Sequence, residues 1–146
     1  MKNILFAFLV LTILGCSNQD DPGDVNTAQY EDIVTILPQG TWRVSFYFNM
    51  NTDNTTLFES YEFTFNEDET INIENDLLSE DGTWTYQDNS STTENNEELL
   101  LQFSQSPPFD EISKTWDITA VNTNKVDLKF TEENSGKASF LAFTKI

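Results

Sequence analysis

Side chains that carry chemistry are few in this chain of 146 residues. The sequence contains no histidine and one cysteine, Cys16. Without histidine, the chain lacks the commonest general base, the usual partner of a catalytic serine and the commonest metal ligand. With one cysteine, it forms no internal disulfide, and Cys16 is its one thiol nucleophile. We therefore rank an enzyme last among the functional classes, and we expect no catalytic residues, no metal and no cofactor.

Carboxylates, in contrast, are abundant. Asp and Glu number 25 against 7 Lys and Arg, which gives a net charge of −18. Phosphate binding needs clustered bases, so the composition argues against nucleic acid as a partner. The densest acidic runs, at residues 67–69 and 94–98, lie in turn-like, Asn-rich sequence and match no calcium-loop spacing. We interpret both runs as solvated surface charge.

The N-terminus has the pattern of an export signal. Lys2 precedes an apolar run from Ile4 to Leu14. This run is shorter than the roughly 20 residues of a membrane span and has the length of a signal-peptide apolar region. It ends in Ile13-Leu14-Gly15-Cys16, which resembles the lipobox of bacterial lipoproteins. The resemblance implies that Cys16 takes up a diacylglycerol and becomes the membrane-anchored first residue. The alternative is an ordinary signal peptide with an incidental or buried cysteine.

Three segments follow from this pattern. Residues 1–15 are the signal peptide, residues 16–27 are the lipidated Cys16 and a polar, flexible tether, and residues 28–146 are the folded domain. Ser17 stands where an Asp retains many lipoproteins at the inner membrane, so we expect the outer membrane. Ser17 to Asp21 resembles the acidic export signal of Bacteroidota surface lipoproteins. A location on the cell surface and one on the periplasmic face both stay open.

The period of the apolar residues changes near Gly40. Before it, Tyr30, Ile33, Val34 and Leu37 recur at helical spacing and predict one short helix over residues 28–37, which ends before Pro38. After it, eight short runs alternate with a period of two, as half-buried strands do. In the first run, Trp42, Val44, Phe46 and Phe48 alternate with Arg43, Ser45 and Tyr47, and we expect the first set to face inward. In the last run, Phe140 and Ala142 compete with Leu141 and Phe143 for the inward face.

The connections between these runs are short and rich in turn residues. Without room for crossovers, strands pair with their sequence neighbours in antiparallel fashion. Eight such strands close into an up-and-down β-barrel, which removes exposed edges. The sequence therefore predicts an all-β, eight-stranded antiparallel barrel preceded by one short helix. A two-sheet β-sandwich is the alternative.

Several motifs resemble the lipocalin-like lipoproteins of Bacteroidota. The motifs are Gly40-Thr41-Trp42 after a short helix, Tyr61 to Asn66 before a turn, Gly82-Thr83-Trp84, Trp116 to Thr119, and a closing Leu141-x-Phe143-x-Lys145. The resemblance covers residues 28–146 and implies a lipocalin-like barrel that binds a small ligand. Gly40 and Trp42 form the structural motif: a Trp at the start of a barrel plugs its closed end, and the Gly lets the helix approach.

Two functions compete for such a barrel. An eight-stranded barrel is just wide enough to hold one small ligand, and our first hypothesis is a binding protein for a small apolar molecule such as a fatty acid. Its candidate interior residues are Val44, Phe46, Phe48, Tyr61, Phe63, Ile71, Trp84, Leu101, Phe103, Trp116, Leu128 and Phe130. The second hypothesis is an interaction or structural protein, because the same bulky side chains can simply fill the barrel. Its protein partner would be unknown from the sequence.

Overall fold

The computed structural model describes residues 33–89, 97–103 and 106–146. The expected signal peptide, Cys16, the tether and residues 28–32 of the expected helix lie outside this part of the chain. Within the described residues, no helical segment has the length and apolar character of a membrane span.

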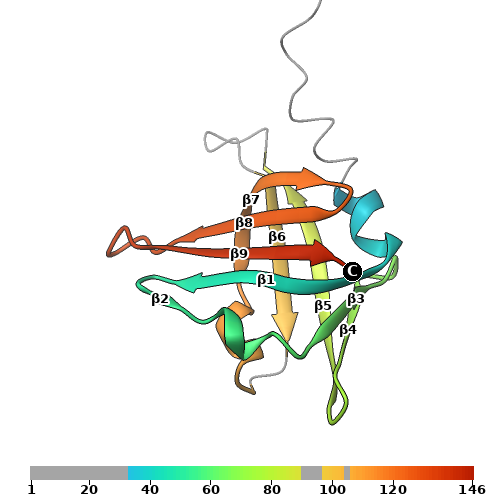
Figure 1. Ribbon diagram of the computed structural model, residues 1–146. Coiled ribbons are helices and arrows are strands. Elements are labelled where there is room, and N and C mark those ends of the chain that lie inside the picture. Colours follow the sequence, from blue (N-terminus) through green and yellow to red (C-terminus); the bar gives the residue numbers. More distant parts are fainter. Residues whose placement is uncertain (1–32, 90–96, 104–105) are drawn as a thin grey trace, which may run out of the picture.

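One antiparallel sheet closes on itself to form the domain (Figure 1). Its strands are β1 (Thr41–Asn49), β2 (Thr52–Asp53), β3 (Glu62–Phe65), β4 (Thr70–Glu74), β5 (Ser79–Asp88), β6 (Glu97–Phe103), β7 (Thr115–Asn122), β8 (Lys125–Thr131) and β9 (Ala138–Lys145). From β3 onward each strand pairs with the next in the chain, β3 also pairs with β1, and β9 closes the ring on β1. The two residues of β2 only extend the far end of β1. The predicted eight-stranded up-and-down barrel is confirmed, and the sandwich alternative does not apply.

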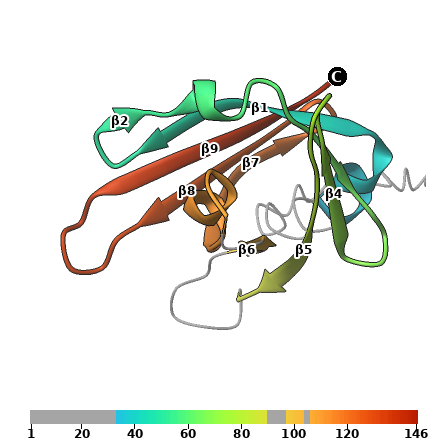
Figure 2. The same cartoon turned by 90° about the horizontal axis from the view of Figure 1, so that it is seen from below.

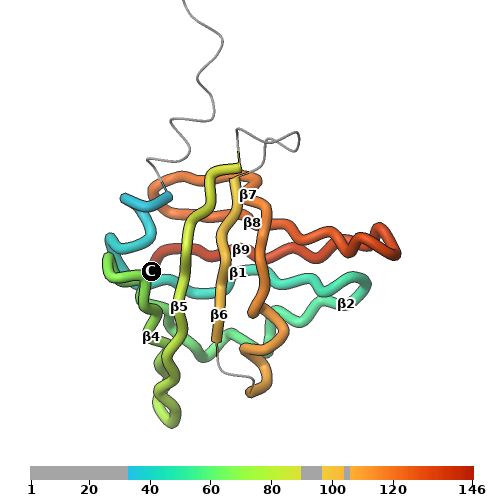
Figure 3. Tube along the Cα trace, turned by 180° about the vertical axis from the view of Figure 1, so that it is seen from behind, coloured from blue at the N-terminus to red at the C-terminus, as the bar shows by residue number. Residues whose placement is uncertain are grey.

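The strands on the two sides of the barrel run in different directions. Strands β8, β9 and β1 run side by side across the front, and β5 and β6 run across them behind (Figures 1 and 3). The β1–β2 and β8–β9 hairpins project beyond the barrel on one side (Figure 2). We call the part of the barrel formed by β8, β9 and β1 the front wall. Its hairpins extend beyond the other strands on one side.

A β-bulge reverses the expected orientation of half of β1. The register between β1 and β9 shifts between Val44 and Phe46, so one extra residue enters β1 and the side-chain alternation changes phase. Tyr47 is completely buried, whereas Phe46 is 42% exposed. Phe48 lies on the outer face with Phe46, their rings parallel within 5°. The prediction that Phe46 and Phe48 line the interior is wrong for this reason.

The helical entry to the barrel also differs from the prediction at its end. Residues 33–36 are α-helical and continue into η1 (Leu37–Gln39), a 3₁₀ turn that contains Pro38. Pro38 lies at the start of the 3₁₀ segment, and its fixed φ is compatible with a helical turn. The helix therefore runs past Pro38 instead of ending before it.

Two further 3₁₀ turns complete the domain: η2 (Thr55–Leu57) after β2 and η3 (Phe109–Ile112) between β6 and β7. The buried apolar cluster draws its members from residues 33 to 143 and includes side chains of η1 and η3.

Candidate functional site: the barrel interior and its surface

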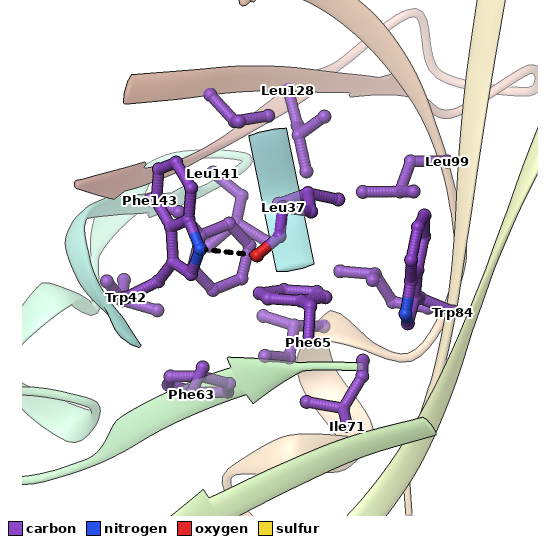
Figure 4. Packing of buried hydrophobic residues seen from close by; sticks show 14 of the residues in the cluster. Leu37, Trp42, Phe63, Phe65, Ile71, Trp84, Leu99, Leu128, Leu141 and Phe143 are labelled. Carbon is purple, nitrogen blue, oxygen red and sulfur yellow. Dashed lines mark hydrogen bonds between the residues drawn. The ribbon is translucent and has the colours of Figure 1, made fainter. Parts of the chain in front are cut away.

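One end of the barrel is closed by η1 and the first strand. The indole nitrogen of Trp42 donates a hydrogen bond of 2.8 Å to the carbonyl oxygen of Leu37 (Figure 4), and both residues are completely buried. The ammonium of Lys145 lies 5.8 Å from the centre of the Trp42 ring, within the range of a cation–π contact. Gly40 keeps this end tight, since a Cβ there would come within 2.6 Å of the Lys145 side chain. This geometry agrees with the plugging role that the sequence suggested for Trp42.

The opposite end is closed by η3, which lies in one of the connections between strands that the sequence indicated as turns. Phe109 packs edge-on against Tyr61 and Phe63, with ring centres 5.0 and 6.4 Å apart. The indole nitrogen of Trp116 donates to the carbonyl oxygen of Ile112 at 3.0 Å. Phe109 and Ile112 are buried, so η3 covers this end of the barrel with side chains that belong to the core.

Hydrogen bonds hold η3 to strand β1 and to the residue that follows β2. The Tyr47 hydroxyl donates to the backbone carbonyl of Glu111 at 3.2 Å, and the amides of Asn49 and Asn54 donate to the Glu111 carboxylate at 3.4 and 3.1 Å. Burial raises the pKa of Tyr47 far above its usual value, and the negative charge of Glu111 raises it further. The phenol therefore keeps its proton at neutral pH and donates this hydrogen bond to η3.

The centre of the barrel is filled with interlocking side chains (Figure 4). The rings of Phe63 and Phe65 both meet Phe143 edge to face, at 5.3 and 5.5 Å between ring centres. An internal void of the size of a water molecule would leave accessible surface on the side chains around it. The central side chains have 0% accessible surface; they include Trp42, Phe63, Ile71, Ile73, Leu99, Leu101, Trp116, Val126 and Phe143. No water-sized void adjoins these residues.

Ten of the twelve candidate interior residues lie inside. Eight are buried: Val44, Phe63, Ile71, Trp84, Leu101, Phe103, Trp116 and Leu128. Tyr61 and Phe130 are partly buried and pack against this core, while Phe46 and Phe48 lie outside. In β9, Leu141 and Phe143 take the inward face and Phe140 is exposed. Sequence reasoning missed Tyr47, Phe58, Phe109 and Ile112, of which the last two carry the signal of apolar residues three apart.

Open clefts lie on the surface instead. The cleft at the η1 end measures about 520 Å³ and is lined by Val34, Thr35, Pro38, Gln39, Glu67, Glu69, Trp84 and Tyr86. Its size falls within the range of ligand sites, but its walls mix carboxylates with rings and differ from the apolar pocket that a fatty acid needs. Two further clefts, of about 580 and 610 Å³, lie beside the Arg43–Glu62 ion pair and beside Phe130.

The acidic turns have structural partners. The carboxylate of Asp68 accepts hydrogen bonds from the hydroxyl and the backbone N–H of Thr70 at 2.6 and 3.2 Å, and these bonds lower the pKa of Asp68. Asp53 makes the same pair of bonds to Thr55. Among the described residues, no group of three or more His, Cys, Asp or Glu side chains is placed to hold a metal ion.

Two ionisable groups sit against the core without forming a catalytic pair with each other. Burial raises the pKa of Glu97, helped by the nearby charge of Asp88 and opposed by a hydrogen bond from Tyr86. Burial lowers the pKa of Lys114, whose ammonium lies 4.9 Å from the ring centre of Phe130, and the charge of Glu111 opposes that shift. Each is explained by its packing.

These residues form a closed eight-stranded antiparallel barrel with a packed interior, and a comparison with solved structures agrees with that fold. The chain is similar to a DUF4847 family protein from Bacteroides vulgatus ATCC 8482, with a TM-score of 0.51, 15% sequence identity, and coverage of 77% of this chain and 96% of the other. At this identity the likeness shows a shared fold. No family model and no curated protein matches the sequence.

Proposed function

We propose that the protein is a lipid-anchored, non-enzymatic lipoprotein whose barrel is a packed scaffold and whose interactions take place on its outer surface. The proposal keeps the anchor that the lipobox resemblance implies. It places function outside the barrel, in agreement with the second of the two sequence hypotheses.

The observation that supports this proposal most is the absence of accessible surface at the barrel centre. Leu101, Trp116 and Phe143, from three different strands, each have 0% accessible surface. A ligand such as a fatty acid would have to displace these side chains, and repacking a filled core to admit extra carbons typically costs about 1–3 kcal/mol or more. The two ends are also closed, by η1 and by η3.

The test of the packed scaffold is titration of the folded domain with a panel of fatty acids and other apolar molecules while tryptophan emission is recorded. Trp42, Trp84 and Trp116 all contact the core, so an interior ligand would change their emission. We expect no saturable change. Saturable quenching, lost in Leu101→Trp at unchanged stability, would establish an interior pocket and overturn the proposal.

The anchor has its own test. Mass spectrometry of the mature N-terminus should find Cys16 modified with diacylglycerol, and Cys16→Ser should release the protein from outer-membrane fractions. An unmodified Cys16, or a serine variant that still sediments with membranes, would remove the anchor from the proposal. Proteinase added to intact cells then separates a surface location, where the domain is digested, from a periplasmic one, where it survives.

A further inference from the structure

The front wall of the barrel has an outer face unlike the rest of this acidic domain. Strand register places its outward residues in rows. Phe48 lies beside Phe140, which lies beside Lys129; Phe46 lies beside Ala142 and Asp127; and Arg43 lies beside Thr144 and Lys125. We call the six residues Arg43, Phe46, Phe48, Lys125, Lys129 and Phe140 the front face. Strands β1, β9 and β8 present it side by side (Figure 1).

Large apolar rings on this face meet water. Phe46 is 42% exposed and Phe140 is 40% exposed, and the ring of Phe48 lies parallel to that of Phe46 at 6.3 Å between centres. The bulge in β1 produces this arrangement, because it turns Tyr47 inward and leaves two phenylalanines outside. Three neighbouring phenyl rings form an exposed apolar patch, which in a soluble domain marks a contact surface.

The charges around the patch are balanced. Arg43 pairs with Glu62 at 2.9 Å, Lys125 pairs with Asp127 at 2.7 Å, and Lys129 has Asp117 as its cross-strand neighbour on β7. The chain as a whole has a net charge of −18. The front face is thus close to neutral, and another surface can approach it without the repulsion that the acidic remainder creates.

We infer that the front face rests on the phospholipid surface of the membrane that holds the lipid anchor, with the three phenyl rings in the interface. This inference rests on the proposed function, because the anchor keeps the domain next to the bilayer. Sixteen residues separate Cys16 from Ile33, and a chain of that length spans at most about 55 Å. The tether therefore reaches far enough for the front face to lie flat.

The chemistry of the face suits a bilayer better than a second copy of the chain. Aromatic rings are favoured at the membrane–water interface, and the apolar stems of the long basic side chains can lie along it. Two copies that met through this face would also bring two domains of strong negative charge together. Anchoring raises the effective concentration of the bilayer, so weak contacts are enough to orient the domain.

The test uses the mature chain from Cys16 onward, coupled through its single thiol to a maleimide lipid in nanodiscs of phosphatidylcholine with a minority of phosphatidylglycerol. The coupling supplies the anchor artificially, so a negative result here leaves natural lipidation untouched. With spin-labelled lipid in the nanodisc, we expect amide signals of β1, β9 and β8 on the front face to broaden several-fold more than those of the β4–β5 hairpin.

Matched variants make the result specific. In Phe46→Ser/Phe140→Ser the selective broadening should disappear, and binding of the uncoupled chain to vesicles should weaken about tenfold for each ring removed. Leu77→Ser, at a leucine that is 95% exposed in the β4–β5 hairpin, should change neither. Uniform broadening, broadening centred on other strands, or an unchanged pattern in the double variant would overturn the inference. So would a dimer in sedimentation that the double variant converts to a monomer, since the face would then bind a second copy.

Discussion

Leu101 gives the sharpest single-residue test of a packed interior. Its side chain has 0% accessible surface, and its strand, β6, pairs on both sides within the barrel. In a filled core both a smaller and a larger residue are unfavourable. We predict that Leu101→Ala lowers the free energy of unfolding by about 2–5 kcal/mol through lost burial and a new cavity. We predict that Leu101→Trp lowers it by about 1–3 kcal/mol through overpacking.

Urea denaturation followed by circular dichroism measures both effects as shifts in midpoint at constant slope. Leu77→Ala is the control, because Leu77 is 95% exposed and its truncation should change the free energy of unfolding by less than about 0.5 kcal/mol. In a hollow barrel, Leu101→Trp would instead fill empty space. A Leu101→Trp domain as stable as the wild type, or more stable, would refute the packed interior.

Three further predictions test other parts of the structure. Gly82→Ala should lower the melting temperature clearly more than Gly40→Ala. The new Cβ at position 82 would lie 2.8 Å from a backbone oxygen, whereas the one at position 40 would lie 2.6 Å from the flexible side chain of Lys145. Equal melting temperatures would contradict this. Phe46→Ala should change the free energy of unfolding by less than about 0.5 kcal/mol and Tyr47→Ala should lower it by about 3 kcal/mol or more, and the reverse order would exclude the β1 bulge. Glu97→Gln should stabilise the domain at neutral pH, since the raised pKa of Glu97 means that the folded state favours its protonated form; the gain should vanish below the ordinary glutamate pKa of 4.5, and a gain independent of pH would disprove the cause.

The sequence predicted the barrel well because period-two patterning is a strong signal where one face of a strand is buried. Ile71 and Ile73 alternate with the polar residues Thr70, Asn72 and Glu74, so the pattern shows which side faces inward. The order of the strands followed from the short connections, because antiparallel neighbours are the one arrangement that such connections permit.

The front wall was harder to predict because its residues are apolar on both faces. In β1, Phe46, Tyr47 and Phe48 are all aromatic, so the pattern does not reveal a bulge that shifts the phase by one residue. The same ambiguity affected Phe140 to Phe143 in β9. In both strands a phenylalanine is exposed on the outer face, Phe46 in β1 and Phe140 in β9. A rule that places every aromatic residue inside therefore fails in these strands.

The closure of the second end escaped the sequence for a different reason. Phe109 and Ile112 follow Pro107 and Pro108, which indicate a turn, and turns are expected on the surface. In the structure this turn folds into η3 and contributes two buried side chains to the core. The interior is filled partly by these residues, which sequence patterning assigned to a loop. The strands alone therefore did not decide between a hollow and a filled barrel.

Xenon binding in solution tests the packed interior most directly. Apolar cavities of modest size take up xenon without any specific chemistry, so the gas reports empty space irrespective of the ligand. With methyl-labelled protein under xenon pressure, we predict that the signals of Ile71, Leu101 and Leu128 shift no more than those of exposed Leu77. Saturable shifts confined to these interior methyl groups would demonstrate a cavity inside the barrel and contradict the account.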